Sequence, residues 1–309
     1  MLALGVSGGR VMLVEEATGV VKWEVQAHSG ERLHAKVAMS PDGRFVASVG
    51  GDDAHWTLWD AEMGTENRVG ASHDGTGGCI CDFPENGRFE EGCPVVAHTS
   101  SLLALAFSPC GKILATGGLD RAVILWNAQT GKAEQRFQRN AGRVCSLSFS
   151  ADGTRLASGS TVPGSGSVRV WNVTTGSFVC AMKKDNERCE FAVHFSPTAI
   201  RSLAAVGHDL DVWDVDSGVP IRGIDADSRD FAVFSLDGRT IATASIDNEV
   251  HLIEAETGTF LHMMDGHALG GFSSAAFSLD GSKLAAGSFD WRLQGVGLVD
   301  GSAPAHHPS

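Results

Sequence analysis

The sequence predicts an all-β fold made of seven copies of one four-stranded unit. A glycine follows a bulky residue by five positions seven times, and the bulky residues recur every 40 to 45 residues, with one longer interval of 67. The stretches around them follow the two-residue period of β-strands. A recurrence of about 40 to 45 residues is typical of propeller blades. The pairs are Val14 and Gly19, Trp59 and Gly64, Trp126 and Gly131, Trp171 and Gly176, Trp213 and Gly218, Ile253 and Gly258, and Val296 and Gly301.

Three strands of the unit can be recognised in chain order. The first is an apolar stretch closed by a Ser-x-Asp-Gly-type turn, as in LSFSADG, and Asp and Gly suit tight hairpins. The second ends in small residues, as in ILATGG, which let neighbouring backbones approach closely. The third holds the bulky residue, with apolar residues one and three positions before it on the opposite face. This strand is therefore expected to be buried on both faces between neighbouring sheets.

These repeats resemble those of the WD-repeat β-propeller family. The dipeptides Trp59-Asp60 and Trp213-Asp214 match the family's signature, and the segment ILATGGLDRAVILWNAQTG, preceded by LAFSPCG, is close to a full match. The resemblance covers nearly the whole chain, and seven in-phase copies make it specific. It implies a seven-bladed β-propeller of WD-type repeats.

The resemblance also implies a structural tetrad of hydrogen-bonded side chains in one blade. In the family a His, a Ser or Thr, an Asp and a Trp form this tetrad, and the matching residues here are His98, Thr116, Asp120 and Trp126. The other repeats do not supply all four members at the family's spacing. The rigidity of the blades is therefore expected to be uneven.

The repeat predicts a single propeller domain over residues 1–301, with a disordered tail at 302–309. The long interval holds an insertion at about 73–97, rich in Gly and acidic residues and poor in periodic apolar positions. Long irregular loops on a rigid scaffold tend to carry function or disorder. The insertion is therefore expected to be a mobile loop that affects the choice of partner.

The first and last repeats of the chain lack different strands of the four-stranded unit. In the first repeat the inner strand would begin before Met1, and only eight residues, without a strand pattern, follow Gly301. The first and last blades are therefore expected to be incomplete, the first without its inner strand and the last without its outer strand. In the WD-repeat family these two strands are consecutive, which leads to the hypothesis that the chain is an N-terminally shortened form of a longer protein.

Composition narrows the partners and the compartment. The formal charge of −13 argues against a general surface for nucleic acid or an anionic membrane. No apolar run approaches the roughly 18 residues that span a bilayer, and the N-terminus has no basic region of a signal peptide. The cysteine count is odd, at seven, which favours free thiols and a reducing compartment. A cytoplasmic location is predicted, and a nuclear one is compatible with the same observations.

The sequence contains only weak signatures of a metal, phosphate or catalytic site. Soft-metal ligands occur in and beside the insertion, but a Cys-x-Cys followed eleven residues later by Cys is not a recognised zinc spacing. The glycine-rich stretches lie at strand turns and open no helix, which argues against a phosphate loop. We therefore predict no metal, no cofactor, no catalytic residue and no small-molecule substrate. The ligands considered are His73, Cys79, Cys81, Cys93 and His98.

Surface residues remain as the functional candidates. In the WD-repeat family, partners are commonly held at the top face by residues that flank the start of each inner strand and by the residue before the Asp of the turn between the second and third strands. Apolar residues there would form a binding patch, with charged residues for specificity. The predicted partner-binding residues are Leu33, Ser101, Leu103, Leu119, Arg143, Phe191, Asp230, Ile246, Ser273 and Phe289.

These observations favour a non-catalytic scaffold for protein–protein interaction, acting within a complex and binding a segment of a partner on the top face. One alternative is an enzymatic propeller, such as a quinoprotein-like oxidoreductase, which would need polar or metal-binding residues converging near the centre. Another is a phosphoinositide or nucleic-acid reader, which would need Lys and Arg clustered on one face. Neither pattern is visible in the sequence.

Overall fold

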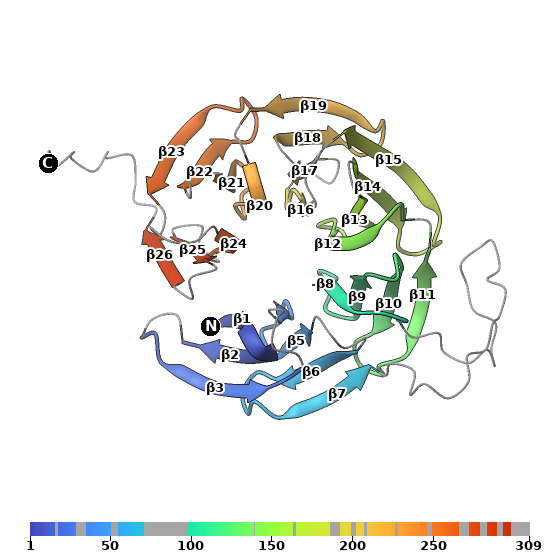
Figure 1. The fold of residues 1–309 in the computed structure, drawn as a ribbon, viewed down its shortest axis with the longest axis vertical. Coiled ribbons are helices and arrows are strands. Elements are labelled where there is room, and N and C mark those ends of the chain that lie inside the picture. The colour runs from blue at the N-terminus through green and yellow to red at the C-terminus, as the bar shows by residue number, and fades with distance from the viewer. Residues whose placement is uncertain are drawn as a thin grey trace, which may run out of the picture.

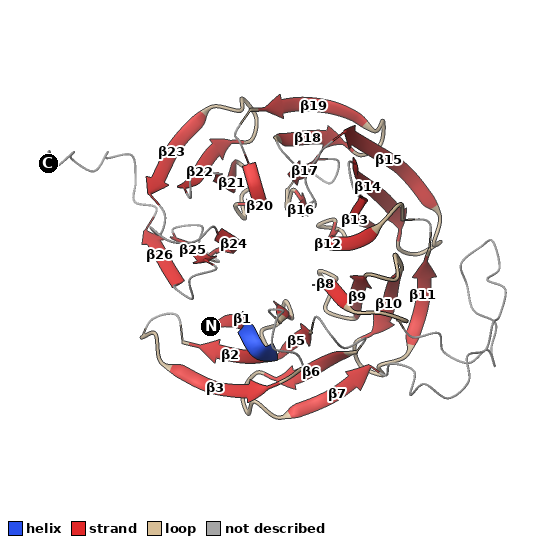
Figure 2. Ribbon diagram, in the orientation of Figure 1, coloured by secondary structure: helices blue, strands red, loops and turns tan. Residues whose placement is uncertain are grey.

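In the computed structural model, the chain forms antiparallel sheets arranged around a common centre (Figure 1). The structure describes residues 1–15, 18–28, 35–50, 55–70, 98–138, 140–162, 165–185, 192–198, 202–206, 209–225, 228–245, 249–265, 272–278, 283–288 and 293–297. Apart from one short helical turn, η1 (Ser7–Gly9), its regular elements are all strands, as Figure 2 shows. The predicted insertion at 73–97 and the predicted tail at 302–309 lie outside these ranges.

Within the described ranges the strands form seven sheets, numbered here in chain order, and two of them contain three strands. Sheet I contains β1 (Leu2–Val6), β2 (Arg10–Val14) and β3 (Val21–Gln26). Sheet VII contains β24 (Phe272–Phe277), β25 (Lys283–Ser288) and β26 (Leu293–Gly297).

The other five sheets contain four strands each. Sheet II contains β4 (Lys36–Met39), β5 (Phe45–Val49), β6 (Trp56–Asp60) and β7 (Glu66–Gly70). Sheet III contains β8 (Leu102–Phe107), β9 (Ile113–Gly118), β10 (Val123–Asn127) and β11 (Ala133–Phe137). Sheet IV contains β12 (Arg143–Phe149), β13 (Arg155–Val162), β14 (Ser165–Asn172) and β15 (Phe178–Asp185). Sheet V contains β16 (Ala192–Phe195), β17 (Ser202–Val206), β18 (Leu210–Asp214) and β19 (Val219–Ile224). Sheet VI contains β20 (Ser228–Phe234), β21 (Thr240–Ser245), β22 (Glu249–Glu254) and β23 (Phe260–Asp265).

Each sheet follows the chain from the centre of the ring outwards. In Figure 1 the inner strands β8, β12, β16, β20 and β24 face the centre, and β3, β7, β11, β15, β19 and β23 lie at the circumference. Successive strands pair antiparallel, as hairpins require. The prediction of an all-β propeller is confirmed. No helix in the described part of the chain is long and apolar enough to cross a bilayer.

The recurring glycine and the bulky residue before it have local roles in the outer hairpin. In sheets I to VI the register shifts at the bulky residue, for example between Leu125 and Trp126, which makes a β-bulge. The glycine then closes the turn with a positive φ, which is 71° at Gly131, and its N–H donates to the carbonyl of Asn127. Glycine adopts this conformation without steric cost. The repeat visible in the sequence is therefore a turn requirement.

Neighbouring sheets are joined by apolar side chains. Among the described residues the core forms six clusters, one for each junction from sheets I and II to sheets VI and VII. At the junction of sheets III and IV, the rings of Phe137 and Trp171 stack with centroids 4.9 Å apart. At the junction of sheets II and III, Trp56 meets Trp126 edge to face at 5.7 Å. The prediction that the third strand is buried on both faces holds in sheet III, where Val123, Ile124, Leu125 and Trp126 are all buried.

A few hydrogen bonds also link the inner strands across sheets. The N–H of Phe195 in β16 donates to Ser148 Oγ in β12 at 2.9 Å, and the N–H of Val193 donates to Ser146 Oγ at 3.1 Å. One sheet further on, the N–H of Phe234 donates to His194 Nδ1 at 3.5 Å. Burial lowers the pKa of His194 to about 4, so this ring is neutral at physiological pH and Nδ1 can accept the bond.

Two glycine substitutions separate turn geometry from packing. Gly43 has φ 70° and open space where a Cβ would lie, so Gly43→Ala should lower the free energy of unfolding by about 1 to 2 kcal/mol through backbone strain alone. Gly64 has φ 67°, but a Cβ there would lie 2.6 Å from Cγ of Trp23, so Gly64→Ala should cost more. Urea unfolding followed by tryptophan fluorescence measures both. Equal costs would show that the contact with Trp23 relaxes freely.

Candidate functional site

One end of the ring gathers the starts of the inner strands and the turns between the second and third strands. Antiparallel pairing places these segments together: Leu102 pairs with Gly118, and Arg143 pairs with Thr161. We call this end the top face and the opposite end the bottom face. The predicted partner-binding residues were chosen for this top face.

Four inner strands carry a β-bulge close to the top face. The register shifts between Leu102 and Ala104 in β8 and between Val144 and Ser146 in β12, and equivalent shifts occur in β20 and β24. A bulge turns a side chain out of the regular alternation, and bulges are frequent beside functional sites. The residues that the strand register skips at these bulges are Leu103, Cys145, Asp230, Phe231 and Ser273. Three of these, Leu103, Asp230 and Ser273, belong to the predicted set.

Sheet III places three predicted residues at the top face. Leu119 directly follows β9, and 42% of its surface is exposed. Its N–H donates to the carbonyl of Ser101 at 2.9 Å, which closes the turn onto the start of β8. Leu103 is half-buried at the bulge of β8. The result is an apolar side chain presented to solvent on a turn whose backbone is fixed.

Sheet IV contributes Arg143 beside this turn. The Arg143 Nε–H donates to Thr161 Oγ1 at 3.3 Å, so the guanidinium is attached to the neighbouring strand β13. Asn140, just before β12, donates from Nδ2 to the carbonyl of Arg121 at 3.1 Å. Arg121 is the one described non-glycine residue with a positive φ, at 62°. Asn140 therefore ties a strained turn of sheet III to the start of sheet IV, and brings Leu119 and Arg143 to one region of the top face.

The structure describes the other predicted partner-binding residues only in part. Asp230 lies in β20 and Ser273 in β24, each at the bulge of its strand. Leu33, Phe191, Ile246 and Phe289 lie outside the described residues. The region that the structure brings together is therefore the one formed by sheets III and IV.

The four residues of the predicted tetrad form one chain of hydrogen bonds. Trp126 Nε1 donates to Thr116 Oγ1 at 2.7 Å, and Thr116 lies 2.8 Å from His98 Nε2. His98 Nδ1 lies 2.9 Å from Asp120 Oδ2. A carboxylate accepts only, so His98 carries its proton on Nδ1 and accepts the Thr116 hydroxyl at Nε2. The chain links the third strand of sheet III to the turn that follows Leu119.

Asp120 is ionised within this buried chain. Burial favours the neutral form, but hydrogen bonds from His98 and from the N–H groups of Ala122 and Thr99 outweigh it and hold the pKa of Asp120 below 3.8. Arg136 Nη2 lies 3.6 Å from Asp120 Oδ2, and both side chains are almost fully buried. A buried charge is stable only when it is paired and hydrogen-bonded, as it is here.

Two further sheets contain partial versions of the same series of hydrogen bonds. In sheet II, Trp59 Nε1 donates to Ser48 Oγ at 2.8 Å, and Ser48 lies 2.9 Å from His28 Nε2. The sequence reasoning missed His28 because it precedes Ser48 by two positions more than His98 precedes Thr116.

In sheet IV, Trp171 donates to Ser158 at 3.0 Å, and Ser158 donates to Asn140 Oδ1 at 2.9 Å. Asn140 thus stands where sheet III has His98. It was missed because it is not a histidine, although its distance of 18 positions from Ser158 equals that from His98 to Thr116. An amide can replace the imidazole because it also accepts at one atom and donates at another.

The residues weighed as metal ligands do not form a described site. His73, Cys79, Cys81 and Cys93 lie outside the described ranges, whereas His98 is engaged by Thr116 and Asp120. Among the residues whose positions are described, no group of three or more His, Cys, Asp or Glu is arranged to hold a metal ion.

Comparisons with known proteins give a consistent picture. A family model described as "WD domain, G-beta repeat" matches residues 22–60, 92–127, 131–172 and 258–294. Autophagy-related protein 16 of Arabidopsis thaliana is 23% identical over 191 residues, which cover 61% of this chain and 36% of that protein. The Arabidopsis thaliana protein named "Cell division cycle 20.5, cofactor of APC complex" is 25% identical over 275 residues, which cover 79% of this chain and 60% of that protein. The chain thus spans less than two thirds of either relative.

A solved structure shares the fold. A chain in the crystal structure of the mitotic checkpoint complex superposes with a TM-score of 0.77 at 19% sequence identity, covering 96% of this chain and 84% of that one. At this level of identity the likeness concerns the fold alone.

Removing the charge of Asp120 tests how much its buried hydrogen bonds and ion pair stabilise the fold. Asp120→Asn should lower the free energy of unfolding at pH 7 by about 3 to 5 kcal/mol, because it breaks the buried pair of Asp120 with Arg136. The pKa of Asp120 is depressed in the folded state, so the advantage of the native residue is fully present above pH 3.8 and is lost as the pH falls through the lower folded-state value. Urea unfolding at a series of pH values measures the difference.

The control for this experiment is Asp216→Asn. Asp216 pairs with Arg155 at a partly exposed site, so its loss should cost less than about 1 kcal/mol. A cost for Asp120→Asn that equals the control, or that does not shrink at low pH, would contradict the assignment.

Proposed function

Because this chain belongs to the WD-repeat β-propeller family, we propose that it is a non-catalytic scaffold that binds a segment of a partner protein on its top face. The observation that carries the proposal is the set of bulges in β8, β12, β20 and β24, all close to the top face. In sheet III the bulge at Leu103 lies in the same strand end that the turn of the exposed Leu119 closes onto through Ser101. Proteins use bulges to direct side chains at functional sites.

The chemistry of the region formed by sheets III and IV fits a peptide-like partner. Leu119 offers an exposed apolar anchor, and Arg143 offers a cation held by Thr161. An apolar centre with a few charged groups is typical of protein interfaces. The turn that carries Leu119 is fixed by Ser101, Asn140 and the Asp120 chain, so little conformational entropy would be lost on binding.

The names of relatives support a role within an assembly. One relative is named as a cofactor of the APC complex, and the structural neighbour is part of the mitotic checkpoint complex. We extend to this chain only the general inference that it binds other proteins in a complex inside the cell. No nucleic acid, membrane or small-molecule substrate is part of the proposal.

We also propose that all seven sheets are blades of the propeller. Sheet I packs on sheet II through Val11 and Leu13, and sheet VII packs on sheet VI through Leu284 and Ala286. Each of the two three-stranded sheets thus buries a face against a four-stranded neighbour, through apolar side chains like those at the other junctions. This packing supports counting them as blades.

Two substitutions test the top face. Truncating an apolar anchor at an interface typically costs about 1 to 4 kcal/mol, so Leu119→Asp combined with Arg143→Glu should reduce partner capture at least ten-fold. Proteins captured by the tagged chain are quantified by mass spectrometry. The circular dichroism spectrum and the melting temperature should stay within error of the unmodified protein, because neither side chain belongs to the apolar clusters.

The matched control is Leu236→Asp, in the turn between β20 and β21 at the bottom face, which is 46% exposed against 42% for Leu119 and lies outside every surface proposed here. Partners that the double variant loses should be retained by this control. Capture that survives the double variant would refute the top-face assignment, and loss in both proteins would indicate a general effect of added negative charge.

A further inference from the structure

Large apolar side chains are exposed on the outer strands of three consecutive sheets. They lie in β15, β19 and β23, within the first four residues of each strand, and between 36% and 58% of each side chain's surface is exposed. We call this set the apolar belt. Its members are Phe178, Val179, Val219, Ile221, Phe260, Leu261 and Met263.

The outer strand of sheet III differs in composition. In β11, Phe137 is buried and Glu134 is exposed, which is the ordinary arrangement. In β7 of sheet II, Glu66 and Asn67 are exposed. Sheet I also exposes an apolar residue, Val21, at the start of its outer strand β3, but among the described outer strands only those of sheets IV to VI expose such residues in three consecutive sheets. An exposed apolar start is therefore not a requirement of the outer strand position.

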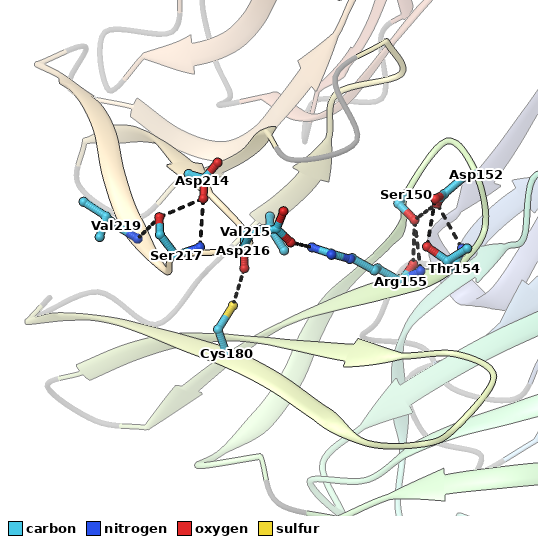
Figure 3. Close-up of polar contacts among 10 residues, drawn as sticks. All are labelled: Ser150, Asp152, Thr154, Arg155, Cys180, Asp214, Val215, Asp216, Ser217 and Val219. Atoms are coloured by element: carbon cyan, nitrogen blue, oxygen red, sulfur yellow. Dashed lines mark hydrogen bonds and ion pairs between the residues drawn. The ribbon is translucent and has the colours of Figure 1, made fainter.

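The belt is continuous from sheet IV to sheet V. The turn before β19 lies on β15: Cys180 Sγ donates to the carbonyl of Val215 at 3.0 Å, and a Cβ on Gly218 would lie 3.7 Å from Cβ of Cys180 (Figure 3). Val219 follows directly in the chain. The start of β19 therefore lies next to the start of β15.

The same relation holds between sheets V and VI. A Cβ on Gly258 would lie 2.9 Å from Cδ of Arg222 and 3.2 Å from Ile224, so the turn before β23 lies on β19. Phe260 begins β23 two residues later. Apolar residues scattered singly are normal on protein surfaces, whereas a contiguous group marks an interaction site.

The backbone beneath the belt is fixed. Asp214 Oδ1 accepts the N–H of Ser217 at 2.8 Å and its hydroxyl at 2.7 Å, and the N–H of Val219 donates to Ser217 Oγ at 3.3 Å. Arg155 of sheet IV pairs with Asp216 of the same turn (Figure 3). A surface held in this way loses little entropy when a partner binds.

The charged residues around the apolar belt indicate which kind of protein segment it would bind. The turns that flank the belt carry Asp214 and Asp216 before β19, and Glu254 and Glu256 before β23. The described cations beside the belt are fewer: Arg155 is paired with Asp216, Arg169 lies over the ring of Phe178 at 5.9 Å, and Arg222 of β19 packs against the turn at Gly258. The chain as a whole carries −13. An apolar surface with an acidic border attracts apolar segments that carry Lys and Arg.

The same charges disfavour a second copy of this chain. Two copies meeting at the belt would bring their acidic turns together, and each would carry a charge of −13. Like charges placed opposite one another at an interface oppose association.

We propose that the apolar belt is a second docking surface, separate from the top face, for an amphipathic basic segment of another protein. The belt begins at the turns of the bottom face and runs along the circumference of sheets IV to VI, whereas the proposed top-face site lies on sheets III and IV. The two surfaces share no residue. The belt proposal therefore stands or fails independently of the top-face proposal.

A defined peptide tests the belt directly. The probe is a fluorescent 18-residue amphipathic peptide of Leu and Lys, and its binding is followed by anisotropy at 50 mM and 300 mM NaCl. The unmodified protein should bind it, more weakly at the higher salt. Ile221→Asn combined with Met263→Gln removes apolar surface without changing charge, and should weaken binding at least ten-fold.

The matched control is Leu119→Asn, which removes an exposed apolar side chain at the top face and should leave peptide affinity within two-fold. Circular dichroism and thermal melting verify that the variants fold. A second peptide, of Leu and Glu, should bind at least ten-fold more weakly than the Leu and Lys peptide.

Three outcomes would overturn the proposal. Equal affinity of the belt variant and the Leu119→Asn control would show that the peptide binds elsewhere. Equal binding of the Leu and Glu peptide would refute the basic partner. Sedimentation showing a dimer that dissociates in the belt variant would assign the belt to a second copy of this chain.

Discussion

The burial of sheet faces against neighbouring sheets is the constraint on which the structure depends. Neighbouring sheets share no backbone hydrogen-bond ladder among the described strands, so apolar side chains and a few side-chain hydrogen bonds hold the ring together. A strand buried on both faces cannot alternate apolar with polar residues. This is why Val123 to Trp126 form an unbroken buried run, and why the repeat is so visible in the sequence.

Local features of the fold could be predicted because they follow from local chemistry. The glycine of each outer hairpin needs a positive φ, and the Ser-x-Asp-Gly turn is closed by its own side chains, as when Ser150 Oγ donates to Asp152 at 2.6 Å. Contacts between sheets could not be predicted in this way. Asn140 is a polar loop residue in the sequence, and only the fold shows that it joins Arg121 of one sheet to Ser158 of the next.

The candidate surfaces also combine features that follow from local sequence with features that depend on the fold. Leu119 could be selected because it lies next to a recognisable turn, whereas the bulge at Leu103 depends on the pairing of β8 with β9 and has no sequence signal. The apolar belt was missed because an apolar residue in an outer strand resembles core. Phe137 and Phe178 both contact the ring of Trp171, one stacked and buried, the other edge-on with nearly half its surface exposed. Their exposure is decided by the neighbouring sheet, or its absence on that side, and not by residue type.

The two proposed surfaces define how such a scaffold would act. The region between them is packed through apolar clusters and the buried hydrogen-bonded residues from Trp126 to Arg136. Partners bound at the top face and at the belt would be held close to one another on this scaffold, so that each raises the effective concentration of the other. The distance and orientation fixed by sheets III to VI would then set which pairs of partners can meet.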